Sequence, residues 1–294
     1  MIDASGIGLI RPDWSVPANV RSFTTTRDGG FSRDRWSTLN LGDQCGDNPA
    51  HVNQNRELLQ PLLPSGVRWL KQVHGTRVVN RDEVSGGLPE ADAVFSFQTG
   101  QVCAVLTADC LPVLFCNRAA TKVAAAHAGW RGLAGGILEA TISAMACAPA
   151  ELIAWLGPAI GPEAYEVGDE VYDSFMSLDS ENASLPRPDP RLPGLDPGSS
   201  FLGRGFERSK WIPDQVRYDG SQVRYDGAFK RSGDRWLADL YGLARRVLLR
   251  AGIKQVSGGR YCTYSEPDKF FSYRRDGVTG RMASVIWLER SGSE

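Results

Sequence analysis

Two histidines and one cysteine stand at the ends of apolar stretches of the sequence, where they could bind a metal ion. His74 is the penultimate residue of WLKQVHG, His127 is the penultimate residue of TKVAAAHA, and Cys110 interrupts TADCLPVLF two residues before a proline. Proline within an apolar run indicates a break, a bulge or an edge strand, where side chains turn toward a site. Cysteine sulfur and histidine nitrogen are typical zinc ligands, and three protein ligands leave a fourth position open, as in catalytic zinc sites. The three residues therefore form a candidate catalytic metal site.

Each of these residues also has a simpler interpretation. A histidine beside alanines and glycines can be a buried imidazole held by a hydrogen bond, and a cysteine in an apolar strand often packs as a small hydrophobic group. The wide spacing of the three residues also lacks the compact cysteine pairs of structural zinc sites. The remaining histidine, His51, lies in the polar segment NPAHVNQNRELL and is interpreted as a solvated side chain. The shared position at strand ends favours the metal interpretation of His74, Cys110 and His127.

The segments that must position these residues are rich in short strands. Six apolar runs between residues 67 and 128 are separated by glycine, proline and Asn-Arg turns: VRWLKQV, TRVVN, DAVFSF, QVCAVLTA, LPVLFCN and TKVAAAHA. Such runs predict strands, and further strands are expected at ELIAWLGP, KQVSGGRYC and MASVIWLE. Apolar residues at helical spacing predict helices over residues 133–148, 168–179 and 236–249. This density of strands indicates a sheet core.

Residues 181–235 differ in character from the rest of the chain. SLPRPDPRLPGLDPGSS is rich in proline, and QVRYDG then occurs twice, at residues 215–220 and 222–227. Two copies are too few for a solenoid, and the absence of apolar heptad positions speaks against a coiled coil. We interpret the segment as an insertion that forms a surface excursion, because lengthening a loop costs little free energy. A lid or a partner contact through Tyr218 and Tyr225 is the alternative.

The composition favours a small-molecule partner. The 294 residues are 42 % hydrophobic, which is ample for a core without disulfides. The formal net charge is −1, so nothing indicates binding to nucleic acid or to a membrane surface. The sequence shows neither a signal peptide nor an apolar span of membrane length, so we expect a cytoplasmic chain. We also expect free thiols, because four of the six cysteines lie in apolar periodic segments: Cys103, Cys110, Cys116 and Cys147.

Seven stretches together resemble the YfiH/laccase-domain family, whose members are also described as multicopper-polyphenol-oxidoreductase-like and as purine nucleoside phosphorylases. They follow one another along nearly the whole chain: TRDGGFS at 26–32, LNLGDQCGD at 39–47, LKQVHG at 70–75, TADCLPVLF at 107–115, AAHAGWRGLAGGI at 125–137, GPAIGPEAYEVGDEV at 157–171 and FFSYRRDGVTGR at 270–281. The resemblance implies one α+β domain over residues 1–294, with mixed β-sheets in the interior flanked by helices. The insertion at about 181–235 lies outside the family core.

The resemblance also implies a chemistry for the site. The family's metal triad falls on the histidine of QVHG, the cysteine of ADC and the histidine of HAGWRG, here His74, Cys110 and His127. It implies zinc as the cofactor, with copper as the alternative metal. The implied activities are phosphorolysis of adenosine, inosine, guanosine and methylthioadenosine, and deamination of adenosine, so a purine nucleoside and phosphate are the expected partners.

Proton transfer and substrate binding need further residues. The expected catalytic residues are Cys110, His127 and Asp109, where Asp109 either moves a proton or orients a ligand histidine. Many relatives have Cys-Cys after IGP, whereas this chain has Glu163 and Ala164, and Glu163 is a second carboxylate to consider. Arginine forks can hold phosphate, and amides can bind ribose or base. The substrate-binding candidates are Arg27, Asn40, Gln72, Arg131 and Arg274.

These substrate-binding candidates have alternatives of their own. Each arginine can equally be an ordinary surface or ion-paired side chain, and Arg275 is expected to point away from Arg274. Trp130 and Phe271 are expected to pack rather than to stack on a base. The oligomeric state is not predicted.

Three other functions stay open at this point. Copper-dependent polyphenol oxidation is disfavoured, because one site of this kind holds one metal and the chain has only three histidines. A metal-free hydrolase, for example one that edits peptidoglycan precursors, would use Cys110 as nucleophile and His127 as base. A zinc-stabilised binding module would need a fourth protein ligand, for which Cys103, Cys116 and Asp109 are the nearest residues.

Overall fold

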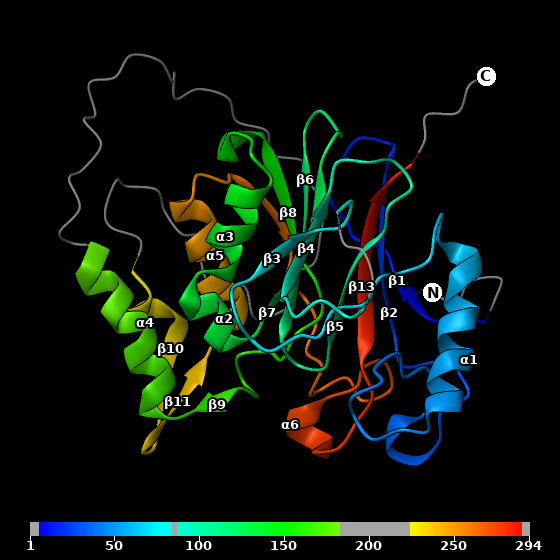
Figure 1. The fold of residues 1–294 in the computed structure, drawn as a ribbon. Helices are drawn as coiled ribbons and strands as arrows, with labels where there is room; N and C mark the ends of the chain where they lie inside the picture. The colour runs from blue at the N-terminus through cyan, green and yellow to red at the C-terminus, as the bar shows by residue number, and fades with distance from the viewer. Residues whose placement is uncertain (1–5, 84–86, 183–223, 290–294) are drawn as a thin grey trace, which may run out of the picture.

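The computed structural model describes residues 6–83, 87–182 and 224–289. Their strands form sheets of four, six and three strands. Figure 1 shows the two larger sheets side by side, with helices on both outer sides of the pair. This is the α+β architecture, with mixed sheets inside and helices outside, that the family resemblance implies.

The six-stranded sheet is the centre of the fold and carries His127. Its strand order is β12 (Gln255–Gly258), β8 (Leu152–Leu156), β6 (Leu111–Asn117), β7 (Val123–Ala128), β4 (Ala93–Ser96) and β3 (Val78–Asn80). The outermost pairs, β12 with β8 and β3 with β4, are parallel, and the inner pairs are antiparallel. Every residue of β6 and β7 is buried, as expected for strands that are covered on both faces.

The four-stranded sheet packs face to face against the six-stranded sheet. Its antiparallel strands follow the order β1 (Leu9–Ile10), β2 (Val20–Thr25), β13 (Met282–Leu288) and β5 (Cys103–Thr107). Successive side chains of a strand point to opposite faces. On β6, Leu114 and Cys116 therefore belong to the apolar core that also contains Val105 of β5, whereas Val113 and Phe115 belong to the core on the helical side.

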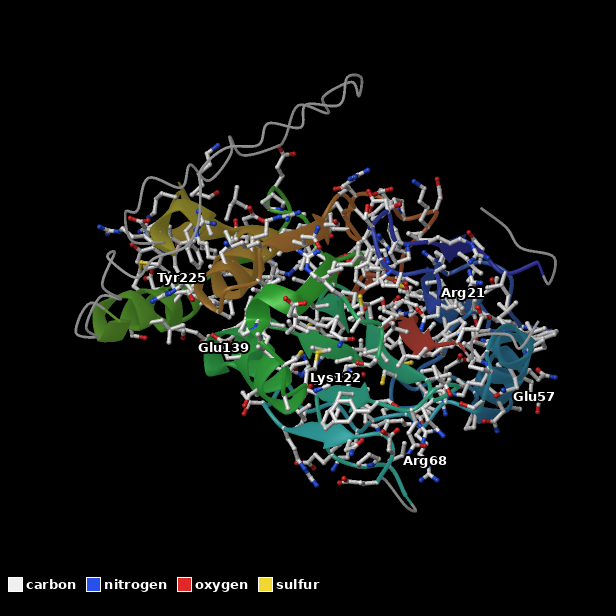
Figure 2. The ribbon with its side chains drawn as sticks, turned by 90° about the horizontal axis from the view of Figure 1, so that it is seen from above. Arg21, Glu57, Arg68, Lys122, Glu139 and Tyr225 are labelled. Carbon is white, nitrogen blue, oxygen red and sulfur yellow. The ribbon has the colours of Figure 1, made fainter. Side chains whose placement is uncertain are left out.

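Helices cover the outer faces of this sandwich. On the outer side of the four-stranded sheet lies α1 (Pro49–Leu59), whose Leu59 packs in one apolar cluster with Val285 of β13. The Asn48 side chain caps this helix by accepting a hydrogen bond from the Ala50 amide. The outer face of the six-stranded sheet is covered by α2 (Trp130–Gly135), α3 (Ile137–Ala144) and α5 (Leu240–Arg250). Figure 2 shows Glu57 on α1 and Glu139 on α3 on opposite sides of the sheets.

A smaller sheet and two further helices complete the described fold. The three-stranded sheet has the order β10 (Phe229–Ser232), β11 (Arg235–Ala238) and β9 (Glu166–Val167), and it packs against α4 (Asp169–Asn182). Tyr172 of α4 stacks on Trp236 of β11 with ring centroids 3.9 Å apart. The short helix α6 (Tyr273–Asp276) lies near the end of the larger sheets. Four single-turn 3₁₀ helices link these elements: η1 (Asp34–Trp36), η2 (Gln60–Leu62), η3 (Pro149–Glu151) and η4 (Asp226–Ala228).

The prediction of a strand at VRWLKQV is wrong. This segment is a loop with one isolated bridge, between Lys71 and Glu90. The amides of Val73, His74 and Gly75 donate to the carboxylate of Asp92 instead of to a neighbouring strand. His74 therefore lies in a loop, not at the end of a strand.

Two of the expected helices have different boundaries. The helix expected over 133–148 is two helices, α2 and α3, divided at Gly136, whose φ of 97° is left-handed and favours glycine. The helix expected over 236–249 begins at Leu240, because Arg235–Ala238 pairs as a strand with β9 and β10. The helix expected over 168–179 is confirmed as α4.

Most of the 181–235 segment lies outside the described residues, including Tyr218 and the first QVRYDG copy. The end of the second copy is described, and its Tyr225 is only 3 % exposed. Its ring packs against Phe175 of α4, with ring centroids 5.7 Å apart. Tyr225 is therefore part of the core on the helical side and not the surface group that a lid or a partner contact would need.

Two further expectations concern cysteines and membranes. All six cysteines are free, as the sequence predicts. None of the helices in the described part of the chain is both long and apolar enough to cross a membrane.

Candidate metal centre and active site

The three candidate ligands come from separate elements and meet at one point. His127 is the penultimate residue of β7, Cys110 lies in the turn between β5 and β6, and His74 lies in the loop before β3. One ligand atom from each residue lies within 4.8 Å of the others. The Cys110 sulfur is 3.6 Å from Nε2 of His74, and the two imidazole rings lie 4.8 Å apart. The structure thus brings together residues that are up to 53 positions apart in the sequence.

Asp92 holds both histidines in place. Its carboxylate, which is fully buried, lies 2.8 Å from Nδ1 of His127. It also accepts hydrogen bonds from the amides of Val73, His74 and Gly75, at 3.2, 2.9 and 2.7 Å. A carboxylate on one ring nitrogen fixes the histidine tautomer and directs the other nitrogen outward. Asp92 therefore orients the His127 ring with Nε2 toward the site and shapes the loop that carries His74.

Gly129 makes room for the three side chains. A Cβ atom at this position would lie 2.7 Å from Cδ2 of His74 and 3.0 Å from the Cys110 sulfur. Its φ of −67° is accessible to any residue, so the need for glycine here is one of space. This explains the glycine that follows the histidine in the HAGWRG stretch.

The electrostatics of the cluster favour the form of cysteine that binds metals. Burial disfavours the Cys110 thiolate, but the charge of His127 and hydrogen bonds from both imidazoles outweigh it and lower the pKa of Cys110 to about 6. For His127, burial acts against the charged form, but the Cys110 thiolate and Asp92 raise its pKa to about 9. Burial also acts against ionised Asp92, while hydrogen bonds from His127 and Gly75 lower the pKa of that carboxyl. A thiolate beside imidazoles in hydrogen-bond reach is a zinc-ligand set.

The donor set fits a metal ion with an open position. It offers one sulfur and two nitrogen atoms, and no fourth histidine, cysteine or acidic residue joins this cluster among the described residues. Cys103 and Cys116 are buried in the core between the two larger sheets. Asp109 uses its carboxylate to accept hydrogen bonds from the Thr263 hydroxyl and the Arg274 amide. The three residues suggested as a fourth ligand are thus all engaged elsewhere.

A cavity of about 400 Å³ opens beside the metal-ligand cluster. This volume lies within the usual range of small-molecule sites. His74, Cys110 and His127 line it together with Tyr165 and Asp109. The rest of the wall comes from residues 42–45, 70, 72, 106–108, 160, 273, 274 and 281.

Two of the five substrate-binding candidates line this cavity. Gln72 does so, although its amide also pairs with the backbone of Leu106 in both directions, at 2.7 and 2.8 Å. Arg274 lines the cavity from α6, where one nitrogen donates to the Glu166 carbonyl and the guanidinium lies 5.4 Å from the Tyr165 ring centre. Both remain predictions as substrate ligands.

The other three candidates, which are Arg27, Arg131 and Asn40, lie outside the cavity wall. Arg27 donates to the carbonyls of Ser37 and Pro267 and lies over the Phe271 ring. Arg131 is exposed, stacks on Trp130 and lies 3.3 Å from Glu170.

Two further residues considered in the sequence also lie outside the wall. Glu163, the second carboxylate considered, is exposed. Arg275 is not among the residues of the cavity wall and pairs with Asp276 at 2.8 Å.

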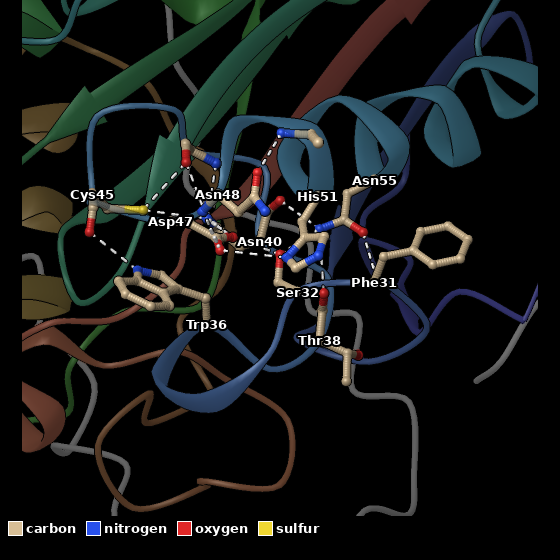
Figure 3. Close-up of polar contacts among 12 residues, drawn as sticks. Phe31, Ser32, Trp36, Thr38, Asn40, Cys45, Asp47, Asn48, His51 and Asn55 are labelled. Carbon is tan, nitrogen blue, oxygen red and sulfur yellow. Dashed lines mark hydrogen bonds and ion pairs between the residues drawn. The ribbon is translucent and has the colours of Figure 1, made fainter.

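Asn40 is fully buried and acts on the cavity indirectly. Its amide nitrogen donates to the Gly42 carbonyl and to Asp47, and its oxygen accepts from the amides of Gly42 and Arg281. Figure 3 shows it within a polar network that also includes Ser32, Cys45 and Asn55. Asn40 therefore fixes the 42–45 segment of the wall and has no free polar group for a ligand.

Three residues of the site were not predicted from the sequence. Asp92 lies in a segment expected only as a strand, and Tyr165 and Arg281 lie within family-like stretches without an assigned role. Tyr165 is a buried residue of the wall, and burial together with the Cys110 charge raises its pKa. The signal that could have pointed to Asp92 is its place at the start of the apolar run AVFSF, since a carboxylate that is buried with such a run needs partners.

The sequence matches the model of a known protein family. A family model described as multi-copper polyphenol oxidoreductase laccase matches residues 21–195 and 198–289. The chain belongs to this laccase-domain family. The match covers His74, Cys110 and His127 and much of the 181–235 segment.

Members of the laccase-domain family with curated names are similar over nearly their full length. The purine nucleoside phosphorylase YfiH of Escherichia coli (strain K12) is 46 % identical over 282 residues, which are 95 % of this chain and 98 % of that protein. A purine nucleoside phosphorylase of Pseudomonas aeruginosa is 42 % identical over 280 residues, with 95 % and 98 % coverage.

Solved structures of similar chains share the fold. A Neisseria meningitidis protein superposes with a TM-score of 0.78 at 46 % identity, covering 96 % of this chain and 99 % of that one. YlmD from Geobacillus stearothermophilus superposes with a TM-score of 0.74 at 29 % identity, covering 96 % and 97 %.

Proposed function

We propose that this laccase-domain protein is a zinc-dependent purine nucleoside phosphorylase. The observation that carries the proposal is the His74, Cys110 and His127 cluster in the wall of a cavity that also contains the Arg274 guanidinium. The names of the similar proteins from E. coli and P. aeruginosa support the same substrate class. Adenosine, inosine, guanosine and methylthioadenosine are the proposed nucleosides.

The proposed reaction exchanges one bond at the sugar for another. A phosphate oxygen forms a bond to C1′ of the ribose, the bond from C1′ to N9 of the purine breaks, and its electron pair leaves with the base. The base takes up one proton, so the products are ribose 1-phosphate and free purine. The protein must therefore hold a phosphate near C1′, stabilise the charge that develops and supply a proton.

The residues of the cavity meet these needs. Arg274 offers cationic donors to the phosphate, and its backbone position is fixed by the 2.6 Å hydrogen bond from its amide to Asp109. Asp109 lies next to Cys110 in the wall and is the proposed proton carrier. Gln72 and Tyr165 are the groups that can hydrogen-bond the nucleoside.

The three ligand residues would hold zinc, which supplies a Lewis acid with an open coordination position and can activate water. That open position favours adenosine deamination as a second activity of the same site, in which water replaces the amino group at C6 and ammonia leaves. Cys110 and His127 act in both proposed activities by holding the ion, oriented by Asp92.

Product analysis tests the proposed function. Metal-quantified protein is incubated with adenosine, with and without phosphate, and the purines are separated by chromatography. Adenine that appears only with phosphate supports phosphorolysis, and inosine formed in both reactions supports deamination. Neither product from any of the four nucleosides contradicts the proposal. Full activity after complete chelation would instead support a cysteine hydrolase that uses Cys110 without a metal.

A further inference from the structure

Arg281 and Arg274 differ from the other arginines of the family-like stretches, because each has an unpaired guanidinium edge within the cavity. Arg27 and Arg275 use their guanidinium groups on backbone carbonyls, and Arg131 and Arg275 lie beside acidic side chains. Arg281 lines the cavity, and its Nη1 alone is engaged by the part of the chain that the structure describes, through the carbonyls of Thr279 and Gly280 at 2.9 and 3.0 Å. Among the described residues, no carboxylate lies within ion-pair distance of Arg281 or of Arg274.

The position of Arg281 is fixed by the neighbouring wall segment. Its amide donates to the buried Asn40 side chain at 2.8 Å, and its carbonyl accepts from the Leu41 amide at 3.1 Å. Its side chain lies directly over Gly42, where a Cβ atom would be 2.6 Å from the Cγ atom of Arg281. The guanidinium is thus directed before any ligand binds, which lowers the entropic cost of binding one.

Arg274, the second arginine of the cavity, is also held in position by neighbouring residues and also keeps an unpaired guanidinium edge. Arg274 is held through its amide by Asp109 and through Nη1 by the Glu166 carbonyl, at 2.6 and 2.7 Å. Its Nε and Nη2 have no partner among the described residues, and neither do those of Arg281. The acidic residues in the wall do not neutralise these charges, since Asp43 lies beside Arg56 and Asp109 accepts from Thr263.

We propose that Arg281 and Arg274 together bind a phosphate group in this cavity. Two guanidinium groups with free N–H edges match the several oxygens of a phosphate, and charge-assisted hydrogen bonds of this kind are strong. The phosphate is either free inorganic phosphate or a phosphate carried by the substrate. The inference deepens the proposed function, because phosphorolysis requires a bound phosphate beside the nucleoside.

Phosphate binding to the metal-loaded, full-length protein tests this inference. Inorganic phosphate and adenosine 5′-monophosphate are titrated separately by calorimetry into the wild type and into Arg281→Gln. We expect the variant to bind phosphate about 10- to 100-fold more weakly, the usual effect of losing a hydrogen bond to a charged group. Arg281→Lys keeps the charge but loses the planar fork, so it should recover only part of the affinity. Arg21→Gln removes an exposed arginine that pairs with Glu289 and should leave phosphate binding unchanged.

A substitution beside Arg281 provides a second measurement. Gly42→Ala keeps both guanidinium charges but places a methyl group against the Arg281 side chain, so phosphate affinity should fall while metal content stays at the wild-type level.

The outcomes separate the sources of the phosphate. Binding of inorganic phosphate that depends on Arg281 supports a phosphate co-substrate, whereas Arg281-dependent binding of the monophosphate alone supports a phosphate carried by the substrate. Equal affinities of Arg281→Gln and wild type, or no binding of either compound to the wild type, overturn the inference. Arg281-dependent phosphate binding in a protein that releases no purine from nucleosides would contradict the proposed function and leave this inference standing.

Discussion

Asp92 is a buried carboxylate that positions residues of the site although it does not line the cavity itself. Its four contacts join the end of β7 to the loop that carries His74, two segments with no strand pairing between them. Because the carboxylate lies on Nδ1 of His127, it also decides which ring nitrogen faces the proposed metal. A sequence pattern cannot show this, since the partners of Asp92 lie 17 to 35 residues away.

We predict that Asp92→Asn weakens metal binding about 10- to 100-fold, the usual cost of losing a carboxylate behind a ligand histidine. The asparagine amide would present N–H groups to backbone amides that need an acceptor. Metal affinity is measured by competition with a chromophoric chelator. Asp82→Asn is the matched control, because Asp82 also accepts hydrogen bonds from a side chain and an amide, those of Ser96 and Phe97, but away from the cavity. Wild-type metal affinity in Asp92→Asn would contradict the role given to Asp92.

At the level of secondary-structure elements, the site forms where strands and loops end. β7 delivers His127, the turn from β5 to β6 delivers Cys110, and the start of α2 brings Gly129 against both Cys110 and His74. The turn at Cys110 is tight, and Asp109 within it has a φ of 92°. Its hydrogen bonds to Thr263 and to the Arg274 amide tie this turn to the segment that carries the cavity arginines.

Gly129→Ala tests this junction of elements. The added methyl group should displace His74 or Cys110, and overpacking of this kind costs about 1–3 kcal/mol, equivalent to a roughly 10- to 100-fold loss of metal affinity. Gly168→Ala adds the same methyl group at the start of α4, where nothing lies within 4 Å, and should bind metal as the wild type does. Equal metal affinities of the two variants would show that the space at Gly129 is not needed by the ligands.

The strands of the core could be predicted from the sequence because apolar runs bounded by turns are a local signal. The runs at LPVLFCN and MASVIWLE are indeed β6 and β13. Loop geometry and strand pairing depend on distant partners, and there the predictions failed. The segment before His74 is a loop because Asp92 takes its amides, and residues 235–238 are a strand because β9 and β10 lie beside them.

The same distinction holds for the site residues. The cluster of His74, Cys110 and His127 could be predicted from residue type and family resemblance, but the use of each arginine could not. Arg27, Arg131 and Arg274 are equivalent in the sequence, and only the structure shows that the Arg274 guanidinium lines the cavity. Arg281 has the same setting but no distinguishing sequence signal.

At the scale of the whole molecule, the apolar core reaches the wall of the cavity through residues such as Leu70 and Ile160, but the three candidate ligands lie outside the apolar clusters. Three apolar clusters fill the space between the two sheets and under the helices on either side, and none of them includes a metal ligand. We therefore expect a fold that does not depend on a metal in the way that small zinc domains do. His74 and the cavity open to solvent from one end of the layers.

Metal removal should therefore abolish activity and leave the fold in place. We expect an unchanged far-ultraviolet circular dichroism spectrum after chelation, and a melting temperature lower by about 5–10 °C, because a bound ion stabilises the native state by mass action. Differential scanning calorimetry of the metal-loaded and chelated protein measures this shift. Cooperative unfolding on chelation at room temperature would show instead that the metal is structural.

The proposed function depends on His74, Cys110 and His127 holding one metal ion between them. Cobalt titration of the chelated protein, followed by absorption spectroscopy, tests it most directly, because a cysteine ligand gives a thiolate-to-cobalt band. We predict saturation at one equivalent with this band in the wild type and in His51→Ala, whose histidine lies on α1 outside the cavity. Cys110→Ser should lose the band and His127→Ala should lose the bound ion, both with wild-type circular dichroism. An identical cobalt spectrum in Cys110→Ser, or no uptake by the wild type, would show that these three residues do not hold the ion.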